Sequence, residues 1–346
     1  MDQRKLDQYS VPALLYREGT VTDCNEKAAL LPGIRKGSPV PEEILLPGAG
    51  TWECSAPLGG VLYRLRASQE ENGTLLLLEE EDQRALSQGQ LDASLYQVRR
   101  FMNQMLRQIG PAIRQEGTEL TRENREQFSK HYYQMIRLMD HLDLLRDAAG
   151  PSGLDAAMDA IDLAQMCARL ARESDGVLAE IGVRLEYEGP EFGLFTRGDM
   201  DLLRTAILEI LSNSARQCGN GGVITMRLRR IGGRASLLLQ DNGPAPTLRQ
   251  RQQMGQRKVL PGIPHPGEGA GLGLSVADAI LRRHGGLMAI GMDGDHARVW
   301  ISLPLRSGTG ISLRSPRPER NAGMSQIIIA LSDVLPGAVI YPDWEE

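Results

Sequence analysis

One glycine-rich stretch, GEGAGLGLSVADAILRRHGG from Gly267 to Gly286, limits what this chain can fold into. Four of its glycines fall within seven residues, and the apolar spacing of a helix begins directly after them. Glycine lets a backbone approach a ligand closely, and the N–H groups in the first turn of a helix attract anions. The stretch therefore predicts a phosphate-binding loop that leads into a helix.

Two earlier segments carry residues suited to the same kind of ligand. In LEILSNSARQ, Glu209, Asn213 and Arg216 are spaced by four and three residues, so they share one face of a helix. The side-chain oxygen of Asn213 is a suitable ligand for Mg2+, and the guanidinium group of Arg216 can donate two hydrogen bonds to a phosphate. In QDNGPAP, Asp241 ends a strand and can accept a hydrogen bond from an amino group such as that of adenine, while Gly243 lets a base lie close to the backbone. Each pattern alone is common, but the three in this order predict a nucleotide site.

The 346 residues divide into four parts by pattern. Short strands, with turns at Gly59–Gly60 and Asn72–Gly73, occupy residues 1–83, and two helical patterns fill residues 84–150. Alternating helices and strands in residues 151–306 predict a sandwich with helices on one side of a mixed sheet. Residues 307–346 contain a short apolar helix that we expect to dock on a folded surface. The expected fold class is multidomain α+β.

Each of the two helical patterns carries one narrow apolar seam. The seam residues are Leu91, Leu95, Val98, Met102, Met105, Ile109 and Ala112 in the first pattern, and Phe128, Tyr132, Met135, Met139 and Leu142 in the second. Such regular spacing is typical of a coiled coil or a helix bundle. Because two helices cannot bury both seams alone, we expect a hairpin that forms a four-helix bundle in a homodimer.

Composition excludes several classes of protein. A net charge of −5 argues against a general nucleic-acid binder. No apolar run approaches the roughly 20 residues of a membrane span, and the polar start MDQRKLDQYS is unlike a signal peptide, so we expect a cytoplasmic protein without a membrane contact. Its four cysteines are scattered without a CxxC pair, which predicts neither disulfides nor a zinc site.

The segment from about 160 to 305 resembles the ATP-binding domain of sensor histidine kinases, within the wider GHKL (Bergerat-fold) ATPases. EILSNSAR looks like the N box, DNGPA like the first Gly box and GEGAGLGLS like the second. The resemblance implies ATP and Mg2+ as cofactors. It implies that Asn213 holds Mg2+, that Arg216 contacts phosphate, that Asp241 reads adenine, and that Gly269, Gly271 and Gly273 line the phosphates. The segment between Gly243 and Gly267 corresponds to the ATP lid, although its charges equally suit an exposed loop. Ala245 replaces the second glycine of the first box.

The rest of the chain fits the same family. Dimeric histidine kinases place a helical hairpin before the ATPase domain, and PALLYREGTVTDCNEKAALL looks like the start of a PAS-type sensor module. The resemblance therefore implies a signalling protein whose partner is a response regulator or another signalling protein.

The phosphoacceptor histidine of the family is missing. The stretch LRQIGP, anchored by Pro111, matches the acceptor motif, and Leu106 stands at the acceptor position. Leucine cannot accept a phosphoryl group, so the alignment excludes autophosphorylation there. We interpret His131 and His141, on the second helix, as surface or packing residues, and His284 as the end of the helix after the Gly-rich loop.

Glu209 lies one turn before Asn213, where hydrolytic members of the superfamily carry a general base. A base there orients water on the γ-phosphate; the alternative is a carboxylate that supports the Mg2+ ligand indirectly. The leading hypothesis is an ATP-dependent conformational switch that lacks autophosphorylation. The alternatives are an active protein kinase, acting on a separate protein or an atypical histidine, and a non-catalytic scaffold.

Overall fold

A computed structural model gives the fold of most of the chain. The residues it describes are 6–41, 44, 51–80, 98, 102–103, 121–149, 159–244, 272–293, 296–306 and 325–340. The predicted first helix of the hairpin, including Leu106, lies almost entirely outside these residues. Among the described residues, no helix is long and apolar enough to cross a membrane.

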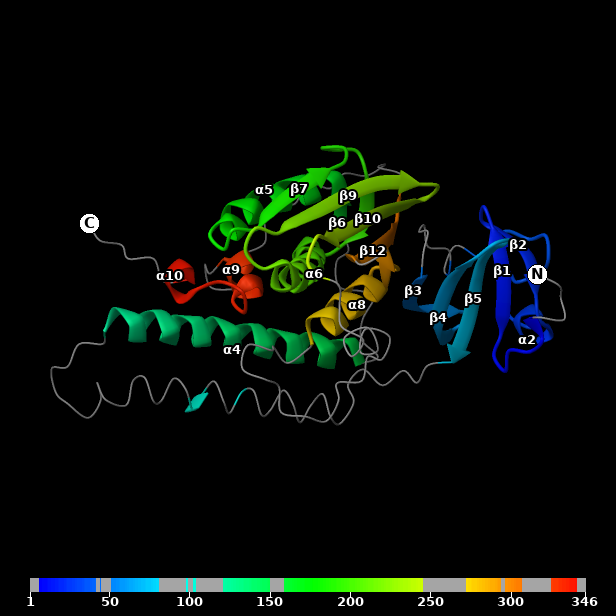
Figure 1. Ribbon diagram of the computed structural model, residues 1–346, viewed down its shortest axis with the longest axis horizontal. Coiled ribbons are helices and arrows are strands. Elements are labelled where there is room, and N and C mark those ends of the chain that lie inside the picture. Colours follow the sequence, from blue (N-terminus) through cyan, green and yellow to red (C-terminus); the bar gives the residue numbers. More distant parts are fainter. Residues whose placement is uncertain are drawn as a thin grey trace.

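The N-terminal part is an antiparallel sheet (Figure 1). Its elements are β1 (Ala13–Arg17), β2 (Thr20–Cys24), α2 (Glu26–Ala29), β3 (Thr51–Leu58), β4 (Val61–Glu70) and β5 (Gly73–Glu80). Glu18 and Gly19 both have positive φ, which suits the tight turn between β1 and β2. Gly59 and Gly60, also at positive φ, connect β3 to β4 as the sequence predicts.

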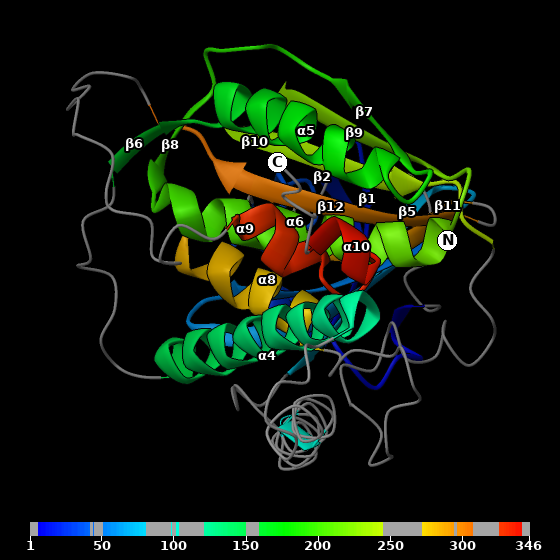
Figure 2. The same cartoon turned by 90° about the vertical axis from the view of Figure 1, so that its left-hand side faces the viewer.

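Residues 159–306, called the ATPase-like part here after the resemblance of their sequence, form a mixed sheet covered on one face by helices (Figure 2). Its main strands are β7 (Arg184–Glu188), β9 (Val223–Ile231), β10 (Arg234–Asp241), β11 (Leu287–Asp293) and β12 (His296–Pro304). Three helices, α5 (Leu163–Ala179), α6 (Met200–Cys218) and α8 (Gly273–Arg283), pack on it. A separate two-stranded sheet joins β6 (Asp159–Asp162) and β8 (Phe195–Gly198). Among the strands that the structure describes, β7 and β9 pair in parallel and the others antiparallel, so the predicted mixed sheet with helices on one side is confirmed.

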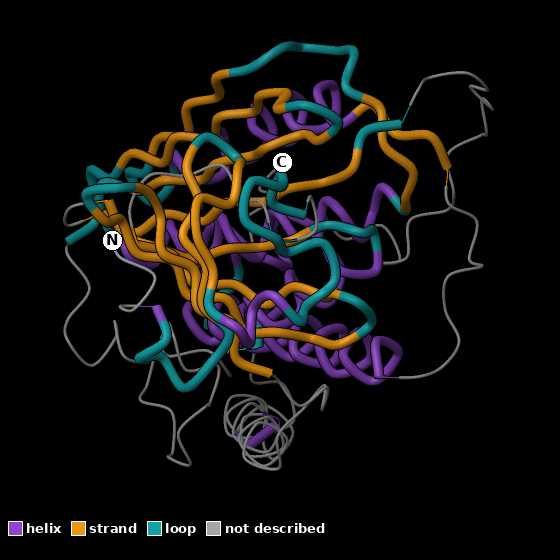
Figure 3. Tube along the Cα trace, turned by 90° about the vertical axis from the view of Figure 1, so that its right-hand side faces the viewer, coloured by secondary structure: helices purple, strands orange, loops and turns teal. Residues whose placement is uncertain are grey.

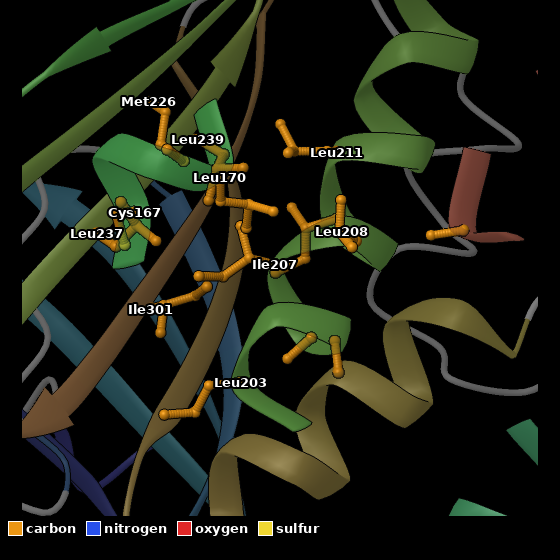
Figure 4. Close-up of a cluster of buried hydrophobic side chains, with 14 of the residues drawn as sticks. Cys167, Leu170, Leu203, Ile207, Leu208, Leu211, Met226, Leu237, Leu239 and Ile301 are labelled. Carbon is orange, nitrogen blue, oxygen red and sulfur yellow. The ribbon is translucent and has the colours of Figure 1, made fainter. Parts of the chain in front are cut away.

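Alternation along the strands builds the core between sheet and helices. Ile224, Met226 and Leu228 of β9 are buried at every second position, as expected for a strand with one covered face. Figure 4 shows Leu170 of α5 and Leu208 of α6 in this cluster with side chains from β9, β10 and β12. Burial of this apolar surface is the main driving force for the sandwich.

The two sheets are joined edge to edge into one sheet of ten strands, in the order β2-β1-β5-β4-β3-β11-β12-β10-β9-β7. Strand β3 pairs antiparallel with β11, with Cys54 opposite Ala289 and Trp52 opposite Gly291. A Cβ at Gly291 would collide with the carbonyl oxygen of Thr51, so glycine permits this close approach. Figure 3, viewed from the end that carries the N-terminus, shows the N-terminal strands side by side. This junction was not predicted from the sequence.

Helix α4 (Arg122–Ala149) runs along the ATPase-like part and uses two faces (Figure 2). One face, with Arg137, Leu138, His141 and Leu145, is buried against it. The predicted seam lies on another face, where Tyr132 and Met139 are 41% and 53% exposed. Tyr132 and Met139 therefore point away from the ATPase-like part, whereas Leu142, the last residue of the seam, packs against its core.

The C-terminal segment docks as predicted, through α9 (Gln326–Leu331) and α10 (Gly337–Ile340). Ile327, Leu331 and Leu335 are buried in the same core as α6 and α4. Gln326 donates hydrogen bonds to the Asp201 carbonyl oxygen and to Thr205 Oγ1, both on α6. A Cβ at Gly337 would lie 2.8 Å from the carbonyl oxygen of Glu126, so α10 also packs directly on α4. The segment thus bridges α4 and the ATPase-like part.

Candidate nucleotide site

Helix α6 presents the first set of predicted site residues. It begins at Met200 because Asp199 caps it, accepting hydrogen bonds from the N–H groups of Asp201 and Leu202. Glu209 is buried, Asn213 is half-buried and Arg216 is exposed, so burial decreases toward the end of the helix. Among the described residues, none is hydrogen-bonded to the Asn213 side chain, whereas Arg216 Nη2 lies 2.9 Å from Asp333 Oδ2.

Asp241 lies where β10 ends beside α6. Its carboxylate is buried, and its Oδ1 accepts a hydrogen bond of 3.1 Å from the Gly243 N–H. Burial raises the pKa of Asp241, partly offset by hydrogen bonds from Gly243 and from the Ser214 side chain. A Cβ at Gly243 would lie 2.7 Å from the carbonyl oxygen of Gln217 on α6. Glycine therefore lets the loop after β10 pack directly against the end of α6.

Gly273 begins α8, and it also lies against α6. No side chain caps α8 at Leu272, so the first-turn N–H groups are not satisfied by a capping residue. A Cβ at Gly273 would lie 2.5 Å from Glu209 Oε2, which is too close for any side chain. Gly269, Gly271 and the predicted lid from residue 245 onward lie outside the described residues.

Glu209 is the centre of a buried ion-pair network with α4. Its Oε2 accepts a 2.6 Å bond from Arg137 Nη2, and its Oε1 lies 3.2 Å from Arg137 Nε and 2.9 Å from His141 Nε2. Burial alone raises the pKa of a carboxyl, but Arg137 and His141 outweigh it and hold the pKa of Glu209 far below its usual value. Both carboxylate oxygens are therefore engaged by α4.

The C-terminal segment extends this network through Asp333. Its Oδ2 accepts a 2.6 Å bond from Arg137 Nη1, in addition to the bond from Arg216, and its Oδ1 accepts a 3.1 Å bond from Gln134. Burial disfavours the charged form of Arg137, but Glu209 and Asp333 outweigh this and raise its pKa. Burial also lowers the pKa of Lys130, which Asp333 partly offsets.

Sequence reasoning missed Arg137 and Asp333, and interpreted His141 only as a packing or surface residue. Arg137, His141 and Leu145 recur every four residues on α4, which is the spacing of a second helix face. That spacing was visible in the sequence, but no local pattern showed that Arg137 and His141 would contact Glu209. Asp333 carries no motif at all.

Comparison with known proteins identifies the domain. Residues 198–316 match the family described as histidine kinase-, DNA gyrase B-, and HSP90-like ATPase. The chain is 28% identical over 176 residues to the sensor protein SphS of Synechococcus elongatus, covering 49% of this chain and 42% of SphS. It is 29% identical over 153 residues to the adaptive-response sensory kinase SasA of Parasynechococcus marenigrum, covering 43% of this chain and 40% of SasA. Residues 198–316 therefore form an ATPase domain of the histidine kinase-, DNA gyrase B-, and HSP90-like type.

The similarity covers about two fifths of the length of these curated relatives. Among solved structures, the histidine kinase AdeS of Acinetobacter baumannii is 13% identical, and the match covers 60% of this chain and 97% of that chain with a TM-score of 0.47.

The described residues of the histidine-kinase ATPase domain fit a bound nucleoside triphosphate. Gly243 and Gly273 both stand where a Cβ would collide with α6, and the start of α8 has no capping side chain. Asp241 offers a buried carboxylate at the loop that Gly243 holds close to α6. Close packing of both glycines against α6 and a helix start without a capping side chain are compatible with backbone N–H groups that face an anion.

Proposed function

We propose that the chain is a histidine-kinase-type signalling protein that binds Mg2+-ATP as a conformational switch and lacks autophosphorylation at the usual position. In this proposal Asn213 holds Mg2+, Arg216 contacts phosphate, Asp241 and Gly243 receive adenine, and Gly269, Gly271 and Gly273 line the phosphates. The bound metal neutralises phosphate charge. The protein is proposed to act in the cytoplasm.

The observation that carries the proposal is the contact between Glu209 and α4. Glu209 lies one turn before Asn213 and pairs with Arg137 and His141 on the helix predicted to belong to the dimer hairpin. In this proposal, a change at the nucleotide site affects α4 directly through the side chain of Glu209, with no intervening residue. The exposed seam of α4, with Tyr132 and Met139, supports a homodimer and offers a surface to a response regulator or another signalling protein.

Two of the described histidines, His141 and His284, are too buried to serve as a phosphoacceptor. His141 is buried against Glu209, and His284 is buried with its Nε2 accepting a hydrogen bond from the Asp199 N–H. Leu106 at the acceptor position therefore supports a switch rather than a phosphoryl relay. An N-terminal sheet preceding the hairpin supports a sensor module of the PAS type.

The contacts of Glu209 favour a positioning role over general-base catalysis. A base needs a lone pair that reaches water near the γ-phosphate, whereas here Arg137 and His141 engage both oxygens. Slow hydrolysis through Glu209 stays a prediction, and phosphate release by a Glu209→Gln variant tests it.

The function is tested with γ-labelled ATP and Mg2+, following nucleotide binding, labelled protein and free phosphate in one sample. We expect saturable binding, no acid-labile label on the chain, and loss of binding in Asn213→Ala. Gln165→Ala, which truncates an exposed amide on α5, is the matched control and should bind as the wild type does. Labelled protein would show a working kinase, and absent binding would leave the scaffold alternative.

A further inference from the structure

Asp333 fills a position built for an anion. Two guanidinium groups, from Arg137 on α4 and Arg216 on α6, share its Oδ2, and the Gln134 amide binds its Oδ1. The side chains of Arg137 and Asp333 are only 8% and 14% exposed. Guanidinium groups converging on one oxygen are the arrangement proteins use for phosphate as well as for carboxylate.

The same position adjoins the phosphate-binding elements of the proposed site. A Cβ built on Gly273, at the start of α8, would lie 3.7 Å from Arg137 Nη2. The other contact of Asp333, Arg216, is one turn beyond Asn213 on α6. Asp333 therefore engages two cations that border the elements proposed to bind phosphate, the start of α8 and the end of α6.

We infer that Arg137, Arg216 and Gln134 form a binding site for the terminal phosphate of a nucleoside triphosphate, and that Asp333 occupies this site as an internal competitor. This inference rests on the proposed function. A phosphate that takes Arg216 and Arg137 displaces the carboxylate, because both anions need the same donors. Displacement removes the contacts that Asp333 makes with α4, so it loosens the C-terminal segment from that helix.

The two ion pairs of Arg137 explain why the exchange is reversible. Arg137 keeps its two bonds to Glu209 when Asp333 leaves, so its charge stays paired in the buried site. Apolar contacts of Leu331 and Leu335, together with Gln326, hold the rest of the C-terminal segment to the core. Asp333 therefore has a high local concentration and returns when the nucleotide dissociates.

Competition of this kind lowers the apparent affinity for the nucleotide by the fraction of time for which the site is open. The test compares the affinities of the full chain for ATP and AMP by calorimetry, in the wild type and in Asp333→Asn. Asparagine keeps the size and one acceptor oxygen but removes the charge. If the site is open about one tenth of the time, the variant binds ATP about tenfold more tightly, while its affinity for AMP, which has no terminal phosphate, stays unchanged.

Glu186→Gln is the matched control, because it removes one negative charge at an exposed position on β7. It should leave both affinities unchanged. A second readout is hydrogen exchange of residues 134–145 on α4, which ATP should speed up in the wild type and which should already be faster in Asp333→Asn. Far-UV circular dichroism checks that the variant is folded.

The outcomes separate the two levels of the proposal. If both proteins bind ATP with equal affinity, or if Asp333→Asn tightens AMP as much as ATP, the anion site is refuted and the proposed function stands. Weaker ATP binding by a folded Asp333→Asn also refutes competition. If neither protein binds ATP, the proposed function fails and the inference fails with it.

Discussion

Replacing Glu209 with glutamine tests the ion-pair network directly. The wild-type carboxylate is 2% exposed and neutralises Arg137, whose guanidinium is also buried. Glutamine has nearly the same shape but no charge, so the substitution leaves the cavity filled and removes only the ionic partner. The expected consequence is a loss of folding free energy rather than a change of fold.

The magnitude follows from what remains around Arg137. Removing one partner of a buried ion pair costs about 3–5 kcal/mol, because the other charge is left without compensation. Asp333 still binds Arg137 Nη1 in the variant, so we expect the lower end, about 3 kcal/mol. Replacing both partners with apolar residues, in Glu209→Leu with Arg137→Met, should cost less than the sum of the single changes, since neither charge is then buried alone.

The assay is urea unfolding at neutral pH, read by circular dichroism, of the wild type, the single variants and the double variant. Glu186→Gln serves again as the control and should change the free energy of unfolding by less than about 0.5 kcal/mol. If Glu209→Gln also changes it by less than about 0.5 kcal/mol, the buried pair is not stabilising and the reasoning is refuted. Unchanged stability together with lost phosphate release would instead support Glu209 as a general base.

Two further predictions concern the contacts around α8. Gly273→Ala should destabilise the protein by about 1–3 kcal/mol and weaken ATP binding, because the added methyl group separates α8 from α6. The control is Gly176→Ala, on the exposed face of α5 with open space around it. It should stabilise the protein by about 0.5–1 kcal/mol in the same urea unfolding assay. Burial lowers the pKa of His284 from its usual 6.5, and the neutral ring accepts a hydrogen bond from the Asp199 N–H at Nε2. The contribution of His284 to the free energy of unfolding should therefore be fully present above pH 6.5 and decline as the pH falls below 6.5. Urea midpoints between pH 7.5 and 5.5 should therefore show a smaller pH dependence for His284→Asn than for the wild type; an identical dependence would contradict the assignment.

The nucleotide-facing residues were predictable because local patterns place them. Glu209 and Arg216 share a face of α6 through helix spacing alone, and Asp241 ends a strand because DNG breaks it. The partners of Glu209 were not predictable in the same way. Arg137 and Glu209 are 72 residues apart in the chain, and 196 residues separate Arg137 from Asp333. No periodicity links segments at such distances.

The edge-to-edge junction between the two sheets was hidden for a different reason. The side-chain pattern of β3 does not tell an edge strand from a strand paired on both sides, because backbone N–H and C=O groups make the pairing. Gly291 was the one local signal, since a glycine inside a strand often marks close approach of another backbone. The sequence reading therefore divided into separate modules what the backbone hydrogen bonds join.

If the proposed function holds, the arrangement of α4 gives a physical reason why signalling needs no phosphoacceptor. One face of the helix contacts Glu209 of the ATPase domain through the ion pair of Arg137 and the imidazole of His141, and another face exposes the apolar seam residues Tyr132 and Met139. Apolar contacts are insensitive to the arrival of a phosphate, whereas ion pairs respond to it directly. In the proposed competition, a nucleotide that displaces Asp333 from Arg137 and Arg216 loosens the C-terminal segment from the first face and leaves the apolar seam residues unchanged. The proposed coupling requires no phosphoryl transfer, because a ligand that binds two arrangements with different affinities shifts their populations by binding alone.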